Sequence, residues 1–138
     1  MSEFLDKVAV VTGAGRGIGN AIAKKLASKG AKIAAISRSV ENSQSCADEI
    51  NSEFPDAAKP YSVDVSNHDD MIDAGKSVLE DFGKVDILIN NAGVTRDNLM
   101  LRMTEEEWDV VLNTNLKGAF NSVKAFQRSL LKQGGARI

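Results

Sequence analysis

Two kinds of segment alternate along the chain, and they differ in the spacing of their hydrophobic residues. Short apolar runs that are rich in β-branched residues and too brief for a helix are typical of strands buried on both faces of a sheet. These runs occupy residues 8–11, 32–36, 61–63 and 85–89. The longer segments between them carry apolar residues at helical spacing. This alternation predicts a parallel sheet with right-handed crossovers and helices on both faces, which is an open, doubly wound α/β fold.

Four helices are predicted from the helical spacing. They cover approximately residues 17–28, 41–54, 69–82 and 104–132. Ser66 is expected to cap the third helix at its N-terminus. At the start of the fourth and longest helix, Thr104 and Glu107 are expected to form a capping box, in which the hydroxyl and the carboxylate each bind a free backbone amide. Residues 136–138 then begin a predicted fifth strand.

Composition and charge limit the class of protein. The chain has 138 residues, of which 43% are hydrophobic and 26% charged, as in soluble globular domains. No apolar run approaches the ~20 residues that span a bilayer, and residues 1–7 lack the apolar core of a secretory signal. The net charge is −2, and the basic residues are scattered rather than clustered as nucleic-acid binding requires. We therefore expect a soluble, cytoplasmic protein that binds neither nucleic acid nor membranes.

The counts of cysteine and histidine narrow the chemistry further. A single cysteine, Cys46, excludes an intramolecular disulfide and any multi-cysteine metal site. A single histidine, His68, excludes a His-pair metal motif within one chain. The acidic clusters at residues 69–70 and 105–107 fall at predicted helix starts, where the helix dipole favours negative charge. The chemistry is therefore expected to come from glycines, hydroxyls, amides and carboxylates, without a metal.

A glycine-rich turn, TGAGRGIG, joins the first predicted strand to the first predicted helix. Its glycines permit a tight turn, close approach of a ligand to the backbone and close packing of helix on strand. The free amides and the dipole at the helix start then attract a diphosphate. A structural turn without a ligand is the alternative, and a Walker-type loop is excluded because no Gly-Lys-Ser/Thr follows. The expected diphosphate-binding residues are Gly13, Ala14, Gly15, Arg16, Gly17, Ile18 and Gly19.

The end of the second predicted strand indicates the choice of cofactor. NAD-binding folds usually place an Asp or Glu about 20 residues after the glycine turn, where it holds the ribose 2′-hydroxyl. This chain has Ser37, Arg38 and Ser39 there instead. The planar cation of Arg38 suits a 2′-phosphate, and Arg16 could reach the same group. The sequence therefore predicts NADP over NAD, with two exposed surface arginines as the alternative.

The segment after the fourth predicted strand carries a family resemblance. Residues 90–93 have the sequence Asn-Asn-Ala-Gly, and together with the spacing of the glycine turn they resemble the short-chain dehydrogenase/reductase family. Residues 93–99, followed by Met103, Thr104 and Trp108, are similar to its branch of 3-oxoacyl-[acyl-carrier-protein] reductases. The resemblance covers residues 7–138. It implies a Rossmann-like fold and NADPH-dependent reduction of 3-oxoacyl thioesters to 3-hydroxyacyl thioesters in fatty acid elongation.

The resemblance also implies a role for each matching residue. Asp64 and Val65 match the family's adenine contact, in which a carboxylate accepts from the exocyclic amine and a backbone amide donates to the ring. Asn115 matches the active-site asparagine, whose backbone carbonyl binds a water that extends a proton relay to the catalytic lysine. Without the resemblance, an asparagine inside a helix is a packing or helix-bending residue. The residues implied to lie beside the cofactor ribose are Asn91, Ala92 and Gly93.

The family's other catalytic residues cannot be placed in this sequence. Its reaction uses a tyrosine as general acid, a lysine four residues later that favours the phenolate, and an earlier serine that polarises the carbonyl. The only tyrosine is Tyr61, on the predicted third strand, and Val65 stands four residues beyond it. In relatives the serine follows the fifth strand. We therefore expect residues 1–138 to be the NADP-binding portion of a single-domain reductase whose catalytic portion lies outside the sequence.

Alternative functions stay open beside this one. They are a non-catalytic nucleotide-binding module, an interaction protein that docks through the helix over 104–132, and a short-chain reductase of another carbonyl or alcohol. We favour the reductase portion because domain boundaries usually fall in polar linkers, whereas this chain stops inside an apparent strand. Relatives often form tetramers through the long helix, so the full-length form is expected to be a homo-tetramer. Its partner is expected to be an acyl thioester, with acyl carrier protein as the candidate carrier.

The chain of 138 residues is expected to show no oxidation of NADPH with acetoacetyl thioesters, because the tyrosine, lysine and serine cannot be placed in it. The absorbance of NADPH, recorded over time after the thioester is added to protein of verified intact mass, measures this oxidation. Turnover by the verified chain would contradict the assignment of catalysis to residues outside the sequence.

Overall fold

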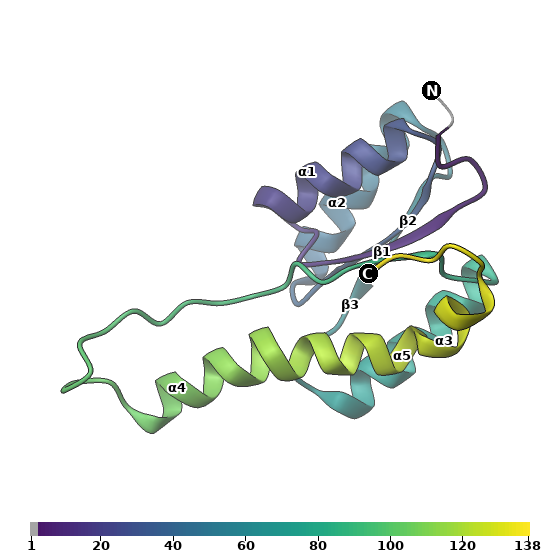
Figure 1. Cartoon of the computed structure of the whole chain (residues 1–138). Helices are drawn as coiled ribbons and strands as arrows, with labels where there is room; N and C mark the ends of the chain where they lie inside the picture. The colour runs from purple at the N-terminus through teal and green to yellow at the C-terminus, as the bar shows by residue number, and fades with distance from the viewer. Residues whose placement is uncertain (1–2) are drawn as a thin grey trace.

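The computed structural model describes residues 3–138 and places a parallel sheet between two layers of helices (Figure 1). The strands stand in the order β3-β2-β1-β4, and each neighbouring pair is parallel. The strands are β1 (Val8–Thr12), β2 (Lys32–Ser37), β3 (Ala58–Ser62) and β4 (Ile87–Ile89). The doubly wound α/β fold predicted from the alternating segments is therefore confirmed.

The helices largely follow the predicted ranges. They are α1 (Gly17–Ser28), α2 (Val40–Glu53), α3 (His68–Phe82) and a long final helix made of α4 (Glu105–Val111), η1 (Leu112–Lys117) and α5 (Gly118–Lys132). The η1 stretch is a π-helix, which the spacing of apolar residues does not predict. No helix among residues 3–138 is long and apolar enough to cross a membrane. Within the same residues, no group of three or more histidine, cysteine or acidic side chains could hold a metal ion.

Alternate residues of the central strands supply two separate cores. In β1, Ala9 and Val11 pack with α1 and α2, while Val8 and Val10 pack with α3 and α5. All five residues of β1 are buried. Burial on both faces explains why this run is apolar throughout instead of alternating with polar residues.

Both predicted helix caps need correction. The N-cap of α3 is Asn67, whose side chain accepts from the Asp70 amide at 3.1 Å, and not Ser66. Ser66 instead donates its hydroxyl to Asp64 at 2.7 Å. At the start of α4, Thr104 Oγ1 accepts from the Glu107 amide at 3.1 Å, as predicted. The Glu107 carboxylate, however, accepts from the Thr104 hydroxyl at 3.3 Å rather than from a backbone amide, so only half of the capping box forms.

The third strand starts earlier than predicted and is not buried on both faces. It spans Ala58–Ser62 rather than residues 61–63, and Lys59 is exposed. Because β3 lies at the edge of the sheet, it accommodates Pro60, which cannot donate to a strand ladder. Asn51 of α2 covers the same edge: its side chain accepts from the Ala58 amide at 2.9 Å and donates to the Ala58 carbonyl at 3.0 Å.

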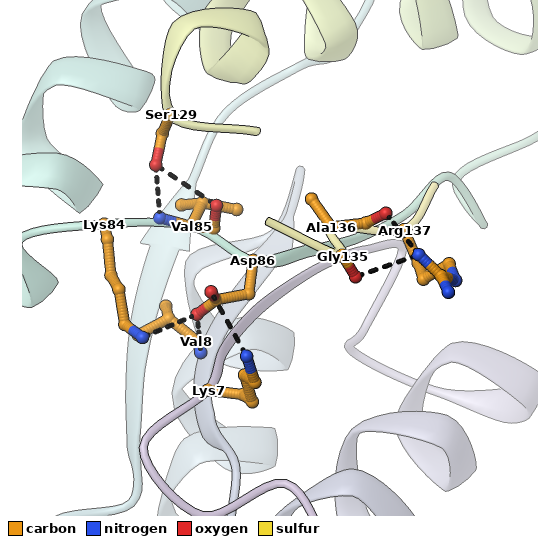
Figure 2. A network of polar contacts seen from close by, with 9 residues as sticks. All are labelled: Lys7, Val8, Lys84, Val85, Asp86, Ser129, Gly135, Ala136 and Arg137. Carbon is orange, nitrogen blue, oxygen red and sulfur yellow. Dashed lines mark hydrogen bonds and ion pairs between the residues drawn. The ribbon is translucent and has the colours of Figure 1, made fainter. Parts of the chain in front are cut away.

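The fourth strand starts at Ile87, two residues later than predicted, and at Val85 a side chain takes the place of a neighbouring strand (Figure 2). The Ser129 hydroxyl of α5 accepts from the Val85 amide at 2.7 Å and donates to the Val85 carbonyl at 3.1 Å. Asp86 is 3% exposed, and its Oδ2 accepts from the Val8 amide at 2.9 Å and pairs with Lys84 Nζ at 3.1 Å. These bonds fix α5 and β1 to the amino end of β4.

The predicted fifth strand begins beside β4. Arg137 forms a parallel bridge with Ile87. The Leu88 amide donates to the Arg137 carbonyl at 3.0 Å, and the Arg137 amide donates to the Asp86 carbonyl at 3.1 Å. The new strand thus joins the sheet at the edge opposite β3.

Substitution of Gly75 by alanine is expected to destabilise the fold, because α3 and α5 meet at this residue. A Cβ atom there would lie 2.9 Å from Ala125 Cβ and 3.2 Å from the Ala125 carbonyl oxygen. Overpacking of this kind typically costs about 1–3 kcal/mol, and the higher helix propensity of alanine offsets up to about 1 kcal/mol. Urea unfolding should therefore show a lower free energy of unfolding for Gly75→Ala.

Gly134→Ala is the matched control for this substitution. Gly134 has an ordinary φ and no atom within 4 Å of a Cβ built on it. Its free energy of unfolding should stay within about 0.5 kcal/mol of the wild type. If Gly75→Ala were as stable as the control, the close approach of α3 and α5 would not limit stability.

Candidate functional site

An open cavity of about 660 Å³ lies beside the carboxyl ends of β1 and β2. Open α/β sheets bind ligands at this edge. Four separate segments and Thr114 form its wall. The lining residues are Gly13, Gly15, Arg16, Gly17, Ile36, Ser37, Arg38, Ser39, Asn42, Val63, Asp64, Val65, Asn91, Ala92, Gly93, Val94, Arg96 and Thr114.

Most of the site residues expected from the sequence meet at this cavity. Those on its wall are Gly13, Gly15, Arg16, Gly17, Arg38, Asp64, Val65, Asn91, Ala92 and Gly93. Ala14, Ile18, Gly19 and Asn115 do not line it. Ala14 is fully buried in the core, Ile18 is 74% exposed, and Gly19 is buried within α1. The turn therefore offers four of its seven expected residues to the cavity.

The glycines of the turn are required by its backbone and by close packing. Gly13 and Gly17 have φ of +65° and +61°, which residues with a side chain rarely adopt. A Cβ at Gly13 would lie 2.8 Å from the Asn91 Nδ2 atom and 2.9 Å from Ala92 Cα. A Cβ at Gly19 would clash with the Gly13 carbonyl oxygen and with the Asn91 side chain. The turn thus packs directly against the residues that follow β4.

The first turn of α1 is suited to an anion. Arg16 occupies the N-cap position and makes no side-chain hydrogen bond to the helix, and the first turn holds no acidic residue. By contrast, the side chains of Ser39, Asn67 and Thr104 cap the helices α2, α3 and α4. Uncapped amides at a helix start together with the helix dipole form an anion-binding site.

Thr12 does not line the cavity but holds two residues of its wall, a role that the sequence analysis missed. It is 1% exposed, and its Oγ1 accepts from the amides of Asn91 and Ala92 at 3.1 and 3.0 Å. Its hydroxyl donates to the Ile89 carbonyl at 3.3 Å, while Asn91 Nδ2 donates to the Gly13 carbonyl at 3.2 Å. These bonds join the end of β1 to the end of β4. Thr12 opens the TGAGRGIG turn, but that turn was interpreted through its glycines, and nothing in the sequence indicates that the threonine bonds to residues 91 and 92.

The two arginines expected at the cofactor phosphate both lie on the cavity wall. Arg16 and Arg38 are exposed, and neither takes part in an ion pair within the described part of the chain. The backbone at Arg38 is held by the Ser62 hydroxyl, which donates to the Arg38 carbonyl at 3.0 Å. Asn42, which the sequence analysis did not single out, lies on the wall and packs closely against Gly15.

Asp64 and Val65 present unused hydrogen-bonding groups on the wall of the cavity. Asp64 Oδ1 accepts from the Ser66 amide at 3.0 Å and from the Ser66 hydroxyl at 2.7 Å. Among residues 3–138, neither Asp64 Oδ2 nor the Val65 amide takes part in a hydrogen bond. An acceptor and a donor on neighbouring residues suit a planar ring that carries an amine beside a ring nitrogen.

Asn115 does not line the cavity, but its side chain bonds to the backbone of Val94, which does. It lies in the π-helical η1, its Oδ1 accepts from the Val94 amide at 2.8 Å, and its Nδ2 donates to the Val94 carbonyl at 3.0 Å. Gly93 approaches it so closely that a Cβ there would lie 3.1 Å from Asn115 Oδ1. Its side chain therefore holds residues 93–94, and single π turns inside helices are frequent at functional sites.

Tyr61 does not belong to the cavity wall described above. Its hydroxyl donates to Asp81 Oδ2 at 2.5 Å. Partial burial and the hydrogen bond to the Asp81 carboxylate both raise the pKa of the Tyr61 phenol. This tyrosine is therefore a poor general acid for chemistry in the cavity, in agreement with its unsuitable position in the sequence.

Comparison with known proteins places these features in a family context. The family model for short chain dehydrogenase matches residues 7–138. The 3-oxoacyl-[acyl-carrier-protein] reductase of Vibrio cholerae is 44% identical over 132 residues, which are 96% of this chain and 52% of the relative. The reductase of the same name from Escherichia coli K12 is 40% identical over 99% of this chain and 54% of its own length. The chain thus spans about half the length of these curated relatives.

Solved structures show the same architecture. A metagenomic short-chain oxidoreductase in complex with NADP matches with a TM-score of 0.88 and 37% identity, over 94% of this chain and 59% of that one. An alcohol dehydrogenase from the archaeon Thermococcus sibiricus, complexed with 5-hydroxy-NADP, matches with a TM-score of 0.90 and 39% identity. That match covers 95% of this chain and 56% of the neighbour.

Replacement of Thr12 by valine is expected to weaken the junction between β1 and β4. The variant keeps the shape of the side chain but leaves the Ala92 amide without its acceptor, and it leaves the Asn91 amide with only the Ile89 carbonyl at 3.1 Å. Unsatisfied polar groups of this kind cost about 1–3 kcal/mol. Denaturant unfolding should show this loss, and hydrogen exchange at the two amides should accelerate.

Thr12→Ser is the control, since it retains the hydroxyl. It should keep most of the protection of the Asn91 and Ala92 amides and lose only the stability of one buried methyl group, about 1 kcal/mol. Equal amide protection in the valine and serine variants would contradict the role of the hydroxyl.

Proposed function

The chain belongs to the short-chain dehydrogenase family, and on that premise we propose that it forms the NADP-binding part of an NADPH-dependent reductase. The observation that carries the proposal is the cavity itself. Segments that are far apart in the sequence meet there: the glycine turn with the uncapped start of α1, Arg38, Asp64 and residues 91–93. These groups match the diphosphate, the 2′-phosphate, the adenine and the ribose of one dinucleotide.

Each part of the cofactor has a proposed set of partners. The diphosphate binds at residues 13–19, whose backbone a side chain at Gly13 or Gly19 would disrupt. Arg16 and Arg38 bind the 2′-phosphate, since the cavity presents both guanidinium groups and no carboxylate follows β2 directly. Asp64 and Val65 bind the adenine, and residues 91–93 lie against the ribose. When bound, the nicotinamide supplies a hydride to the carbonyl carbon of the substrate.

The substrate that we propose is a 3-oxoacyl thioester, reduced to the 3-hydroxyacyl form. The similarity to two 3-oxoacyl-[acyl-carrier-protein] reductases over nearly the whole chain supports this class, with acyl carrier protein as the carrier. The similarity to an alcohol dehydrogenase, with a TM-score of 0.90 and 39% identity, favours a second candidate, a reductase of another carbonyl or alcohol. Both candidates use the same NADP site.

Asn115 is proposed to contribute its backbone carbonyl to the proton relay of the reaction. The π-helical turn around it supports this role, because a widened turn alters which carbonyls the helix ladder satisfies. Its side chain is occupied by Val94, so the carbonyl is the group that it has to offer. The serine, tyrosine and lysine of the reaction are proposed to lie outside residues 1–138.

The long helix is proposed to form subunit contacts in a homo-tetramer. Trp108, Leu112, Leu116 and Phe120 follow one another at four-residue spacing, with exposed fractions of 54%, 38%, 69% and 56%. Four large apolar side chains in one exposed row favour packing against another protein surface. A second copy of the chain is the proposed occupant, because closed symmetric assemblies bring identical surfaces together.

The choice of NADPH over NADH is the test of the proposed cofactor site. The intact protein should bind NADPH more tightly than NADH. Arg38→Ala and Arg16→Ala should each weaken NADPH binding by about tenfold or more, because a charge-assisted hydrogen bond to the 2′-phosphate is lost. Because NADH lacks this phosphate, Arg38→Ala should leave its dissociation constant unchanged, and Arg16→Ala should weaken NADH binding less than NADPH binding, since residues 13–19 also bind the shared diphosphate.

Arg128→Ala serves as the control in the same fluorescence titration, since Arg128 is exposed on α5 and does not line the cavity. It should bind both dinucleotides as the wild type does. Tighter binding of NADH than of NADPH by the wild type would refute the assignment of Arg16 and Arg38.

A further inference from the structure

A buried asparagine on α5 bonds to the backbone of Val65, one of the residues that line the cavity. Asn121 is 0% exposed and does not line the cavity. Its Nδ2 donates to the Val65 carbonyl at 2.8 Å, and its Oδ1 lies 2.8 Å from Nδ1 of His68. It thus connects a residue of the wall, Val65, with the first residue of α3.

The hydrogen-bonding capacity of these groups fixes their orientation. The Val65 carbonyl can only accept, so the Asn121 amide nitrogen must face it, and Oδ1 must face His68. His68 Nδ1 therefore donates its proton. The His68 ring also stacks against Phe120, with ring centroids 6.3 Å apart and planes 23° from parallel.

The peptide between Val65 and Ser66 is held at both of its polar atoms. Its carbonyl accepts from Asn121, and its amide donates to Asp64 Oδ1 at 3.0 Å. The ladder of β3 ends at Ser62 and does not fix this peptide. In addition, α5 approaches so closely that a Cβ on Gly118 would lie 2.7 Å from Val65 Cγ2. The position of Val65 is therefore set by α5.

We propose that Asn121, oriented by His68, is a positioning residue for the adenine side of the cavity. It fixes the Val65 carbonyl, and with it the placement of the Val65 amide relative to the Asp64 carboxylate, the two groups that are proposed to bind the ring nitrogen and the amine of the adenine. This inference rests on the proposed NADP site. It adds a residue, Asn121, that affects ligand binding through Val65 without lining the cavity itself.

Asn121→Asp is the variant that separates the two hydrogen bonds of Asn121. A carboxylate still accepts from His68, but it places an acceptor opposite the Val65 carbonyl. Calorimetric titration of the intact protein should show about tenfold weaker binding of NADPH. Adenosine 2′,5′-bisphosphate, which contains only the adenosine side of the cofactor, should weaken by the same factor.

His68→Phe is the second variant, and it affects only the orientation of Asn121. Phenylalanine keeps the stack on Phe120 and removes the donor to Asn121 Oδ1. Binding of both ligands should weaken by about two- to fivefold, the effect of one ordinary hydrogen bond. Because His68 is only partly buried, this variant should fold even if Asn121→Asp does not.

Two control variants distinguish positioning from a general loss of stability. Ser122→Ala removes a buried hydroxyl from the residue next to Asn121, where it bonds only to the Gly118 carbonyl at 2.9 Å. Ser129→Ala removes the partner of the Val85 backbone and should lower the melting temperature. Both should leave the dissociation constants of the two ligands unchanged, since neither side chain hydrogen-bonds to Val65.

The outcomes separate this inference from the proposed function. If the wild type binds neither NADPH nor the bisphosphate, the proposed function is wrong and this inference with it. If the wild type binds both and Asn121→Asp binds as tightly as Ser129→Ala does, only the positioning role is overturned. If Asn121→Asp does not fold, His68→Phe decides: weaker binding of both ligands supports the role, and unchanged binding overturns it.

Discussion

The contact between the glycine turn and the residues after β4 determines where a ligand can bind. Gly19 lies against the Gly13 carbonyl and the Asn91 side chain, and the last two are joined by a hydrogen bond of 3.2 Å. A side chain at Gly19 would push α1 away from the sheet. Because α1 packs this closely, its uncapped first turn lies at the carboxyl end of β1, beside the cavity. The other segments of the cavity wall, which follow β2, β3 and β4, lie around this first turn of α1.

The two ends of the sheet differ in what their side chains do. At the amino end of β4, buried Asp86 and Ser129 satisfy backbone atoms and bind strands to helix (Figure 2). At the carboxyl end, Arg16, Arg38 and the second oxygen of Asp64 have no partner within the described residues. Side chains hold the backbone at both ends of the sheet, Thr12 among them, but the unpaired polar side chains that could bind a ligand lie at the carboxyl end.

The parts of the fold that were predictable are those encoded by local patterns. The apolar runs, the helical spacing and the glycine turn each follow from neighbouring residues, and they led to the correct fold and to the strand–turn–helix unit. Family resemblance added the residues after β4. The contacts that the sequence did not reveal join distant segments. Thr12 bonds to Asn91, and Asn121 bonds to Val65, across separations of 79 and 56 residues.

Local competition explains the smaller errors. Ser66 and Asn67 are both good N-cap residues, and Ser66 is engaged by the preceding Asp64, which leaves Asn67 to cap α3. The π-helical stretch was not predictable from periodicity, because one widened turn hardly changes the apolar spacing. The third strand was misplaced because only Ala58 of its five residues is buried, which reflects an edge position that depends on the order of strands and not on the strand's own sequence.

The edge strand β3 also decides in which direction the sheet can grow. The Val63 amide and the Ala57 carbonyl both bond to β2, so the backbone of the alternate residues Ala58 and Pro60 points outward. Asn51 occupies both polar atoms of Ala58, and Pro60 has no amide to offer. A further strand, whether from this protein or from an aggregating neighbour, meets no continuous row of donors there. The sheet is therefore a template on one side only, the side where Arg137 already pairs with Ile87.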